Sequence, residues 1–131
     1  MLKLSGMKNL KKYYKIKASP ADVYAALTNP FSIEIWTGEH AEMTSNAGDE
    51  FSLFGGDIVG KNLQFETDRK IIQEWYFGDQ KEPSIVTLTL LADKYFTKIE
   101  LLHTNIPDEA FDDINAGWDE SYFGPLKEFF E

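Results

Sequence analysis

The sequence contains no cysteine, no long apolar run and few cations beyond its first 17 residues. Without cysteine there is no disulfide, no thiolate metal site and no cysteine nucleophile. No apolar stretch approaches the ~20 residues that span a bilayer, and the opening segment lacks the apolar run of a signal peptide. We therefore expect a cytoplasmic protein without a membrane span.

Positive charge is scarce and unevenly placed. The net charge is −9 at pH 7, which opposes binding to nucleic-acid phosphates, so this acidic protein is expected to bind no nucleic acid. Six of the 13 Lys and Arg residues fall within the first 17 positions, where no Asp or Glu occurs: Lys3, Lys8, Lys11, Lys12, Lys15 and Lys17. One interpretation is an edge strand that lysines protect from pairing with other chains. The other interpretation is a small basic docking surface.

The 131 residues fit one folded domain, which we place over 1–131. Apolar and polar side chains alternate in several short segments, a pattern that indicates strands. These segments cover 8–18, 50–54, 58–66, 70–77, 84–91 and 95–104. Their short connections, such as the Gly55-Gly56-Asp57 turn, favour antiparallel neighbours.

Helix signals lie on both sides of these strands. Ser19 followed by Pro20 predicts the start of a helix, and Asn29-Pro30 ends it and opens a second short helix over 31–36. After a break at 106–109, apolar residues recur every three or four positions from 112 to 130, which predicts a long amphipathic helix. Pro125 is expected to kink this helix or loosen one turn. Since an antiparallel sheet with one apolar face needs a cover, we expect the helix to lie across it.

Five segments carry a resemblance to a known family. They are KIKASPADVYAALTNP (15–30), GDEFSLFGGDIVGKNLQF (48–65), KIIQEWYF (70–77), IELLHTNIP (99–107) and GWDESYFGPLKEFFE (117–131). In this order they resemble the START-like (SRPBCC, helix-grip) superfamily, and especially the C-terminal domain of activators of the heat shock protein 90 ATPase. The resemblance implies an α+β fold. In it, a curved antiparallel sheet of about six or seven strands surrounds a long C-terminal helix, and two short helices follow the first strand.

The resemblance implies the fold and leaves three alternative functions open. The first is a non-enzymatic module that holds a small apolar ligand between the sheet and the C-terminal helix. The alternative is a co-chaperone-like regulator that binds a heat shock protein 90 homologue through its surface. The third is a cyclase-like enzyme, for which His103 and Tyr122 are the available acid–base groups. We place the ligand-binding module first, and we expect a monomer or a weak dimer.

Motifs of metal, phosphate and nucleophile chemistry are missing. Neither His40 nor His103 has a metal-ligating partner four residues away, and Gly55, Gly56 and Gly60 lack the lysine and hydroxyl of a phosphate loop. We therefore expect no catalysis, no cofactor and no metal. Histidine 103 shares the parity of Ile99 and Leu101, which predicts that it faces the covered side of the sheet.

Aromatic residues are the remaining candidates for a binding site, because large rings line apolar cavities as readily as they fill cores. The residues expected to border the space between sheet and helix are Trp36, Phe65, Gln73, Trp75, His103, Trp118 and Tyr122. The alternative is that these rings simply fill the core. The polar members of the set, including Gln73, would orient one end of a ligand.

Overall fold

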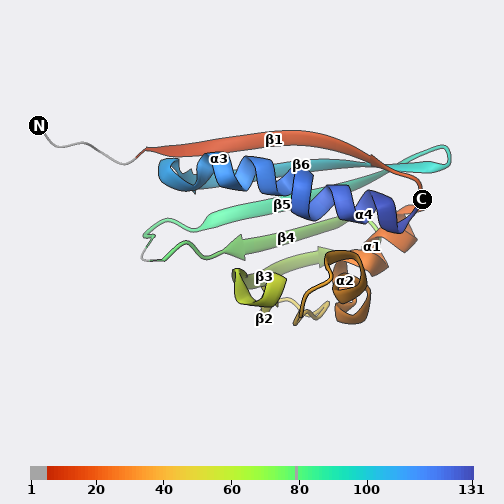
Figure 1. Cartoon of the computed structure of the whole chain (residues 1–131), viewed down its shortest axis with the longest axis horizontal. Coiled ribbons are helices and arrows are strands. Elements are labelled where there is room, and N and C mark those ends of the chain that lie inside the picture. Colours follow the sequence, from red (N-terminus) through yellow and green to blue (C-terminus); the bar gives the residue numbers. More distant parts are fainter. Residues whose placement is uncertain (1–5, 79) are drawn as a thin grey trace, which may run out of the picture.

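The computed structural model describes residues 6–78 and 80–131. Six strands form one antiparallel sheet in the order β1-β6-β5-β4-β3-β2 (Figure 1). They are β1 (Met7–Ile16), β2 (Glu50–Leu53), β3 (Ile58–Glu66), β4 (Lys70–Trp75), β5 (Ser84–Asp93) and β6 (Phe96–Pro107). The helices are α1 (Pro20–Thr28), α2 (Pro30–Thr37), α3 (Asp108–Gly117) and α4 (Gly124–Phe129). The predicted α+β helix-grip architecture is confirmed.

The two short helices begin where the sequence predicts. The Ser19 hydroxyl accepts a hydrogen bond from the backbone N–H of Asp22 over 3.2 Å. The Asn29 side chain accepts one from Phe31 N–H over 2.9 Å. Each cap satisfies a backbone donor that the helix leaves unpaired, and a proline follows each cap at the first helical position. The pair lies at one end of the sheet (Figure 1), where α1 contacts β5 and β6 and α2 contacts α4.

The inner face of the sheet carries the core. Along β5 and β6, buried residues alternate with partly exposed ones, so that Leu88, Leu101 and their neighbours point toward the C-terminal helix. The helix runs across this face in front of β1, β6 and β5 (Figure 1). Buried His103 lies on the inner face, as its parity with Leu101 predicts.

The boundary between β6 and α3 differs from the prediction. A break was expected at 106–109, but Ile106 and Pro107 still pair with Lys8 and Met7 of β1. Ile106 is fully buried, so its packing holds the chain in the sheet up to Pro107. A proline is tolerated at a strand end, where a missing N–H costs little. The helix therefore begins at Asp108, earlier than residue 112.

The C-terminal helix contains one widened turn. A π-helical turn, Trp118–Phe123, joins α3 to α4, and Gly124 N–H donates to the carbonyl of Asp119 five residues earlier. Pro125 follows directly and has no N–H to offer, so the predicted loosening near this proline is confirmed. A Cβ at Gly124 would lie 2.6 Å from the Asp119 carbonyl oxygen. The turn therefore depends on glycine at this position.

The widened turn is fastened to edge strand β1. Asp119 accepts hydrogen bonds from Lys12 Nζ over 2.8 Å and from the Tyr14 hydroxyl over 2.7 Å. These contacts lower the pKa of Asp119, with the Lys12 bond as the larger cause. The Tyr14 ring also stacks on Phe123 with centroids 4.0 Å apart.

Lys8, Lys11, Lys12 and Lys15 lie in β1, an edge strand of the sheet, which confirms the edge-strand interpretation for these four lysines, while Lys17 follows the strand. Lys3 lies outside the described residues. The outward-facing Lys11 and Lys15 pair loosely with Glu100 and Asp93, at 4.0 Å and 3.4 Å.

Candidate functional site: a groove between the sheet and the C-terminal helix

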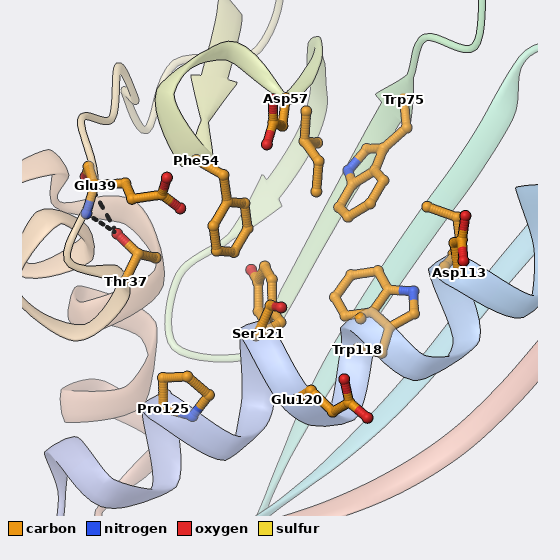
Figure 2. Close-up of a pocket in the computed structure, with 14 residues that line it drawn as sticks. Thr37, Glu39, Phe54, Asp57, Trp75, Asp113, Trp118, Glu120, Ser121 and Pro125 are labelled. Atoms are coloured by element: carbon orange, nitrogen blue, oxygen red, sulfur yellow. Dashed lines mark hydrogen bonds between the residues drawn. The ribbon is translucent and has the colours of Figure 1, made fainter.

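A groove opens where the sheet and the C-terminal helix diverge (Figure 2). Its volume is about 720 Å³, within the range of roughly 300–1,000 Å³ typical of small-molecule sites. Four parts of the chain form it: the end of α2, the turn between β2 and β3, the end of β4, and the C-terminal helix. The lining residues are Thr37, Glu39, Phe54, Asp57, Ile58, Trp75, Asp113, Ile114, Gly117, Trp118, Glu120, Ser121, Tyr122 and Pro125.

Two stacked indoles form the centre of the groove. The rings of Trp75 and Trp118 face each other with centroids 4.8 Å apart and planes 24° apart (Figure 2). Tyr122 lies 4.6 Å from Trp118, and Phe54 approaches Tyr122 from the β2–β3 turn. Trp36 packs edge-on against Tyr122 from α2, with its own N–H bonded to the Ala26 carbonyl. Rings from three parts of the chain, namely the β2–β3 turn, β4 and the C-terminal helix, thus line the groove, and Trp36 packs behind Tyr122.

A buried polar chain holds Trp118. Its Nε1–H donates to Nδ1 of His103 over 3.1 Å, so Nδ1 must be an acceptor. The neutral ring then carries its proton on Nε2, which donates to the Ser84 hydroxyl over 2.8 Å, and Ser84 donates to the Thr104 carbonyl over 3.0 Å. Burial lowers the pKa of His103 to about 3. His103 is therefore a neutral structural group that orients an indole.

A second buried chain holds Trp75. Its Nε1–H donates to the Gln73 side-chain carbonyl over 3.1 Å, and the Gln73 amide donates to the Asn62 side-chain carbonyl over 3.1 Å. The Asn62 amide in turn donates to the Thr44 carbonyl over 3.3 Å. Gln73 and Asn62 are both buried, and both find partners, so the chain costs little desolvation energy.

Strand register explains why the two hydrogen-bonded networks, one at Trp118 and one at Trp75, lie side by side. His103 of β6 pairs with Val86 of β5, Val86 pairs with Gln73 of β4, and Gln73 pairs with Asn62 of β3. The three polar side chains therefore occupy one row across the inner face, beneath the two indoles. Because facing residues in a ladder share one side of the sheet, this row follows from register alone.

The rim of the groove is acidic. Glu39 follows α2, Asp57 lies in the β2–β3 turn, and Asp113 and Glu120 lie on the C-terminal helix (Figure 2). All four are exposed, and none forms an ion pair with another described residue. Of the described residues that line the groove, none is Lys, Arg or His. No cationic side chain among the described lining residues therefore balances the negative charge of the rim.

Tyr122 contributes a polar atom within the apolar part of the groove. Its side chain is 4% exposed, and burial raises its pKa well above the ordinary value. No hydrogen bond links its hydroxyl to another described residue, and the hydroxyl oxygen is not among the fully enclosed polar atoms that lack a partner. This hydroxyl is therefore available to a group that enters the groove.

The structure brings together most residues expected to form a site. Trp75, Trp118 and Tyr122 line the groove. Trp36 lies behind Tyr122, and Gln73 and His103 lie beneath the indoles that they orient. Phe65 stands apart: it is half-buried at the far end of β3, opposite Ile71, and does not line the groove.

Sequence reasoning missed the contribution of the β2–β3 turn. Phe54, Asp57 and Ile58 all line the groove, yet the Gly55-Gly56-Asp57 segment indicates only a hairpin. The 3-10 turn Phe54–Gly56 brings the Phe54 ring toward the helix. The rim carboxylates carry no sequence signal either, because the four positions are far apart in the chain.

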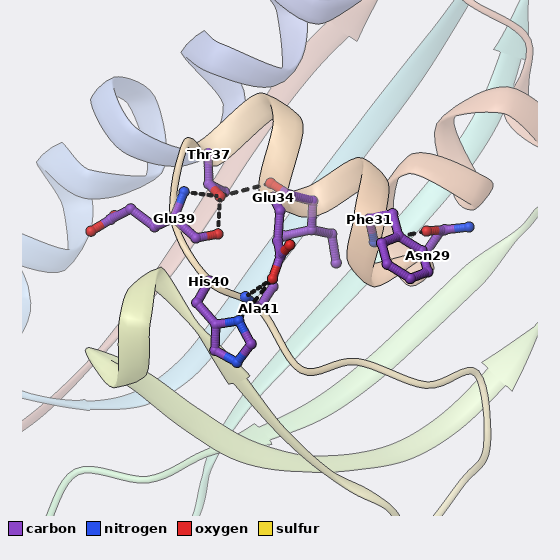
Figure 3. A network of polar contacts seen from close by, with 8 residues as sticks. Asn29, Phe31, Glu34, Thr37, Glu39, His40 and Ala41 are labelled. Atoms are coloured by element: carbon purple, nitrogen blue, oxygen red, sulfur yellow. Dashed lines mark hydrogen bonds and ion pairs between the residues drawn. The ribbon is translucent and has the colours of Figure 1, made fainter.

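His40 does not line the groove and belongs to a polar network after α2 (Figure 3). Glu34 accepts a hydrogen bond from Ala41 N–H over 3.0 Å and contacts Nδ1 of exposed His40 over 2.8 Å. These bonds, chiefly the one from Ala41, lower the pKa of Glu34. The network closes the loop after α2 and thereby places Glu39 at the groove. Within the described residues, no three His, Asp or Glu side chains gather as metal ligands would.

Comparison with known proteins identifies the family. Residues 17–131 match the family described as Activator of Hsp90 ATPase homolog 1-like protein. The chain belongs to this family. A Dictyostelium discoideum relative named as an activator of 90 kDa heat shock protein ATPase homolog is 30% identical over 94% of the chain. The chain spans about a third of the length of the curated relatives it matches, 33% in this case.

Solved structures share the fold of this family. A crystal structure described as an HSP90 activator from Plasmodium falciparum has a TM-score of 0.84 and 25% identity, covering 94% of this chain and 95% of that one. The solution structure of the Aha1 dimer from Colwellia psychrerythraea also gives 0.84, at 19% identity, covering 95% of this chain and 97% of that one. None of the helices described here has the apolar length that a bilayer crossing requires.

Proposed function

We propose that this protein is a co-chaperone-like regulator that binds a chaperone of the Hsp90 class through its surface. The observation that carries the proposal is the family match, which covers 17–131 and includes relatives named as activators of the Hsp90 ATPase. Because the chain corresponds to a third of those relatives, the proposed activity is binding and modulation by this one domain. Because the interior is packed, we expect contacts with a partner to be made by the surface or by the groove.

The outer face of β1 and β6 offers a docking surface for such a partner. Lys11, Tyr13, Lys15 and Lys98 form it, and we call it the outer patch. Tyr13 is 52% exposed, with Lys98 Nζ 4.7 Å from its ring centroid and Lys11 Nζ at 5.9 Å. Exposed aromatic and cationic groups side by side suit an acidic protein surface. The outer patch thus extends the basic docking surface that the sequence suggests.

The test uses the Hsp90-class chaperone of the same cell. The purified chain, carrying an affinity tag, is mixed with the purified chaperone, and both binding and the chaperone's ATPase rate are measured. We expect a measurable complex and a changed ATPase rate. A chaperone that neither binds nor responds at concentrations up to about 100 μM, where typical transient complexes form, would refute the proposal.

The second candidate is a non-enzymatic module that holds a small apolar ligand. A groove of about 720 Å³ lined by rings supports it, together with the unpaired Tyr122 hydroxyl. The two groups available for acid–base catalysis, His103 and Tyr122, are poorly suited to it, which favours a non-enzymatic role over that of a cyclase. His103 has both ring nitrogens engaged and a pKa of about 3, and the pKa of Tyr122 is raised by burial.

This second candidate is tested by co-purified ligand and by probes. Native mass spectrometry of the protein as isolated reports any retained small molecule. Emission of Trp75 and Trp118 reports whether apolar probes enter the groove, since the two indoles line it. Absence of retained ligand, combined with no response to any probe, would refute a ligand-binding role and leave the chaperone role standing.

A further inference from the structure

The groove has an apolar part and a charged part, which suit different groups of a ligand. Its walls are rings, namely Trp75, Trp118, Tyr122 and Phe54, which suit an apolar body. Its rim holds the carboxylates of Glu39, Asp57, Asp113 and Glu120, with no cation among the described lining residues. An anionic ligand would be repelled by this rim, while a cationic one would supply the missing positive charge.

We propose that the groove selects a small organic cation with an apolar body, which its rings hold while the rim carboxylates attract the charge. This inference rests on the ligand-binding role proposed above and adds the charge of the ligand. Two observations besides the acidic rim support it. Aromatic ring faces are electron-rich and attract cations at close range, and the half-buried Phe54 ring lines the groove. The Tyr122 hydroxyl has no partner among the described residues, belongs to a side chain that lines the groove, and is free to accept a hydrogen bond from an ammonium N–H.

The geometry favours a small molecule over a peptide strand. Trp75 belongs to β4, which is hydrogen-bonded to β3 on one side and to β5 on the other. β4 therefore offers no free edge to a peptide backbone at the groove. The lining comes from side chains of four elements, and its volume suits one compact molecule.

The two buried polar chains make the site rigid before a ligand arrives. His103 fixes the Trp118 ring and Gln73 fixes the Trp75 ring, each through the indole N–H. With both N–H groups directed into the protein, the indoles present only carbon surface to the groove. Because these side chains are already ordered, binding costs less conformational entropy than it would at a mobile surface.

The probes are three molecules that share a phenyl-substituted alkyl chain and differ in the charge of the end group. They are 4-phenylbutylammonium (positive), 4-phenylbutan-1-ol (neutral) and 4-phenylbutanoate (negative). Affinities are measured by calorimetry at low salt. We expect the ammonium to bind at least about tenfold more tightly than the carboxylate, with the alcohol between them. Raising salt should weaken the ammonium alone, since added ions screen exposed charges.

Matched variants separate the rim from net charge. Glu39→Gln with Glu120→Gln removes two rim charges, and Glu82→Gln with Glu128→Gln removes two exposed charges elsewhere. We expect the rim variant to bind the ammonium at least about threefold more weakly and the alcohol equally well. The control variant should match the unmodified protein with all three probes.

A groove-filling variant shows where the probes bind. Gly117 lines the groove in helical conformation, and a Cβ there meets nothing within 4 Å. Gly117→Leu should therefore keep the fold and abolish binding, while Gly117→Ala should retain it. Equal affinity for the three probes would refute charge selection and keep a ligand-binding role. Failure of all three to bind, combined with no retained ligand in native mass spectrometry, would refute both ligand proposals, without bearing on chaperone binding.

Discussion

The indole N–H of Trp118 donates a hydrogen bond to Nδ1 of His103 over 3.1 Å, and both side chains are buried. This bond joins the C-terminal helix to the inner face of the sheet at the groove. It also sets the histidine tautomer, because an indole N–H can only donate. A single contact thus connects the stability of the fold with the geometry of the candidate site.

Removal of the Trp118 ring should destabilise the protein strongly. The side chain is 2% exposed and stacks on Trp75, so Trp118→Ala should lower the free energy of unfolding by about 3–5 kcal/mol. Trp118→Phe keeps an aromatic ring but leaves His103 Nδ1 without a donor, at a cost of about 1–3 kcal/mol. Urea unfolding followed by circular dichroism measures both. A loss below about 1 kcal/mol for Trp118→Ala would contradict a buried position.

Acid should weaken the fold through His103. Its folded pKa of about 3 lies below 6.5, the ordinary pKa of a histidine in an unfolded chain. The unfolded state therefore binds more protons between these values, so the stabilisation is complete above pH 6.5 and is lost as pH falls toward 3. One such group gives a slope of about 1.4 kcal/mol per pH unit within the window.

The matched variant for this effect is His103→Gln, whose side-chain carbonyl can still accept from Trp118 N–H. We expect its unfolding free energy to fall less steeply between pH 6 and pH 4 than that of the unmodified protein. Exposed His40 is present in both proteins and cancels in the comparison. Parallel curves for the two proteins would show that His103 is not the source of the acid sensitivity.

Two glycines of the C-terminal helix should respond oppositely to alanine. At Gly124 a Cβ would lie 2.6 Å from the Asp119 carbonyl oxygen, so Gly124→Ala should destabilise the π-helical turn by about 1–3 kcal/mol. At Gly117 the space is open and the backbone is helical, so Gly117→Ala should stabilise by up to about 1 kcal/mol. Thermal unfolding compares them directly. Equal effects would mean that the turn does not require glycine.

Chaperone binding through the outer patch should depend on salt. If the patch meets an acidic partner, affinity should fall steeply between about 50 and 300 mM salt, because ions screen exposed charges. Lys11→Gln with Lys98→Gln should weaken binding severalfold. Lys61→Gln with Lys81→Gln is the control, since both lysines are exposed elsewhere on the chain. Insensitivity to salt and to the first pair would leave β1 with its edge-protecting role alone.

The order and type of the elements could be predicted from local patterns in the sequence. Alternation of apolar and polar residues indicated the strands, Ser19 and Asn29 marked the helix starts, and Pro125 marked the irregular turn. These features are local, because each depends on neighbours along the chain. The boundary at Ile106 could not be read in this way, since burial against the rest of the core, rather than local preference, keeps it in the sheet.

The candidate site, by contrast, depends on tertiary packing. The groove needs Glu39, Phe54, Trp75 and Glu120 from four distant segments, and no spacing in the sequence predicts that they meet. The row that contains His103 and Gln73 depends on strand register, in which a slip of one residue would turn these side chains to the other face. Sequence patterns fix which face of an element is apolar. The space left between two apolar faces is fixed only when they pack, because it depends on where sheet and helix diverge.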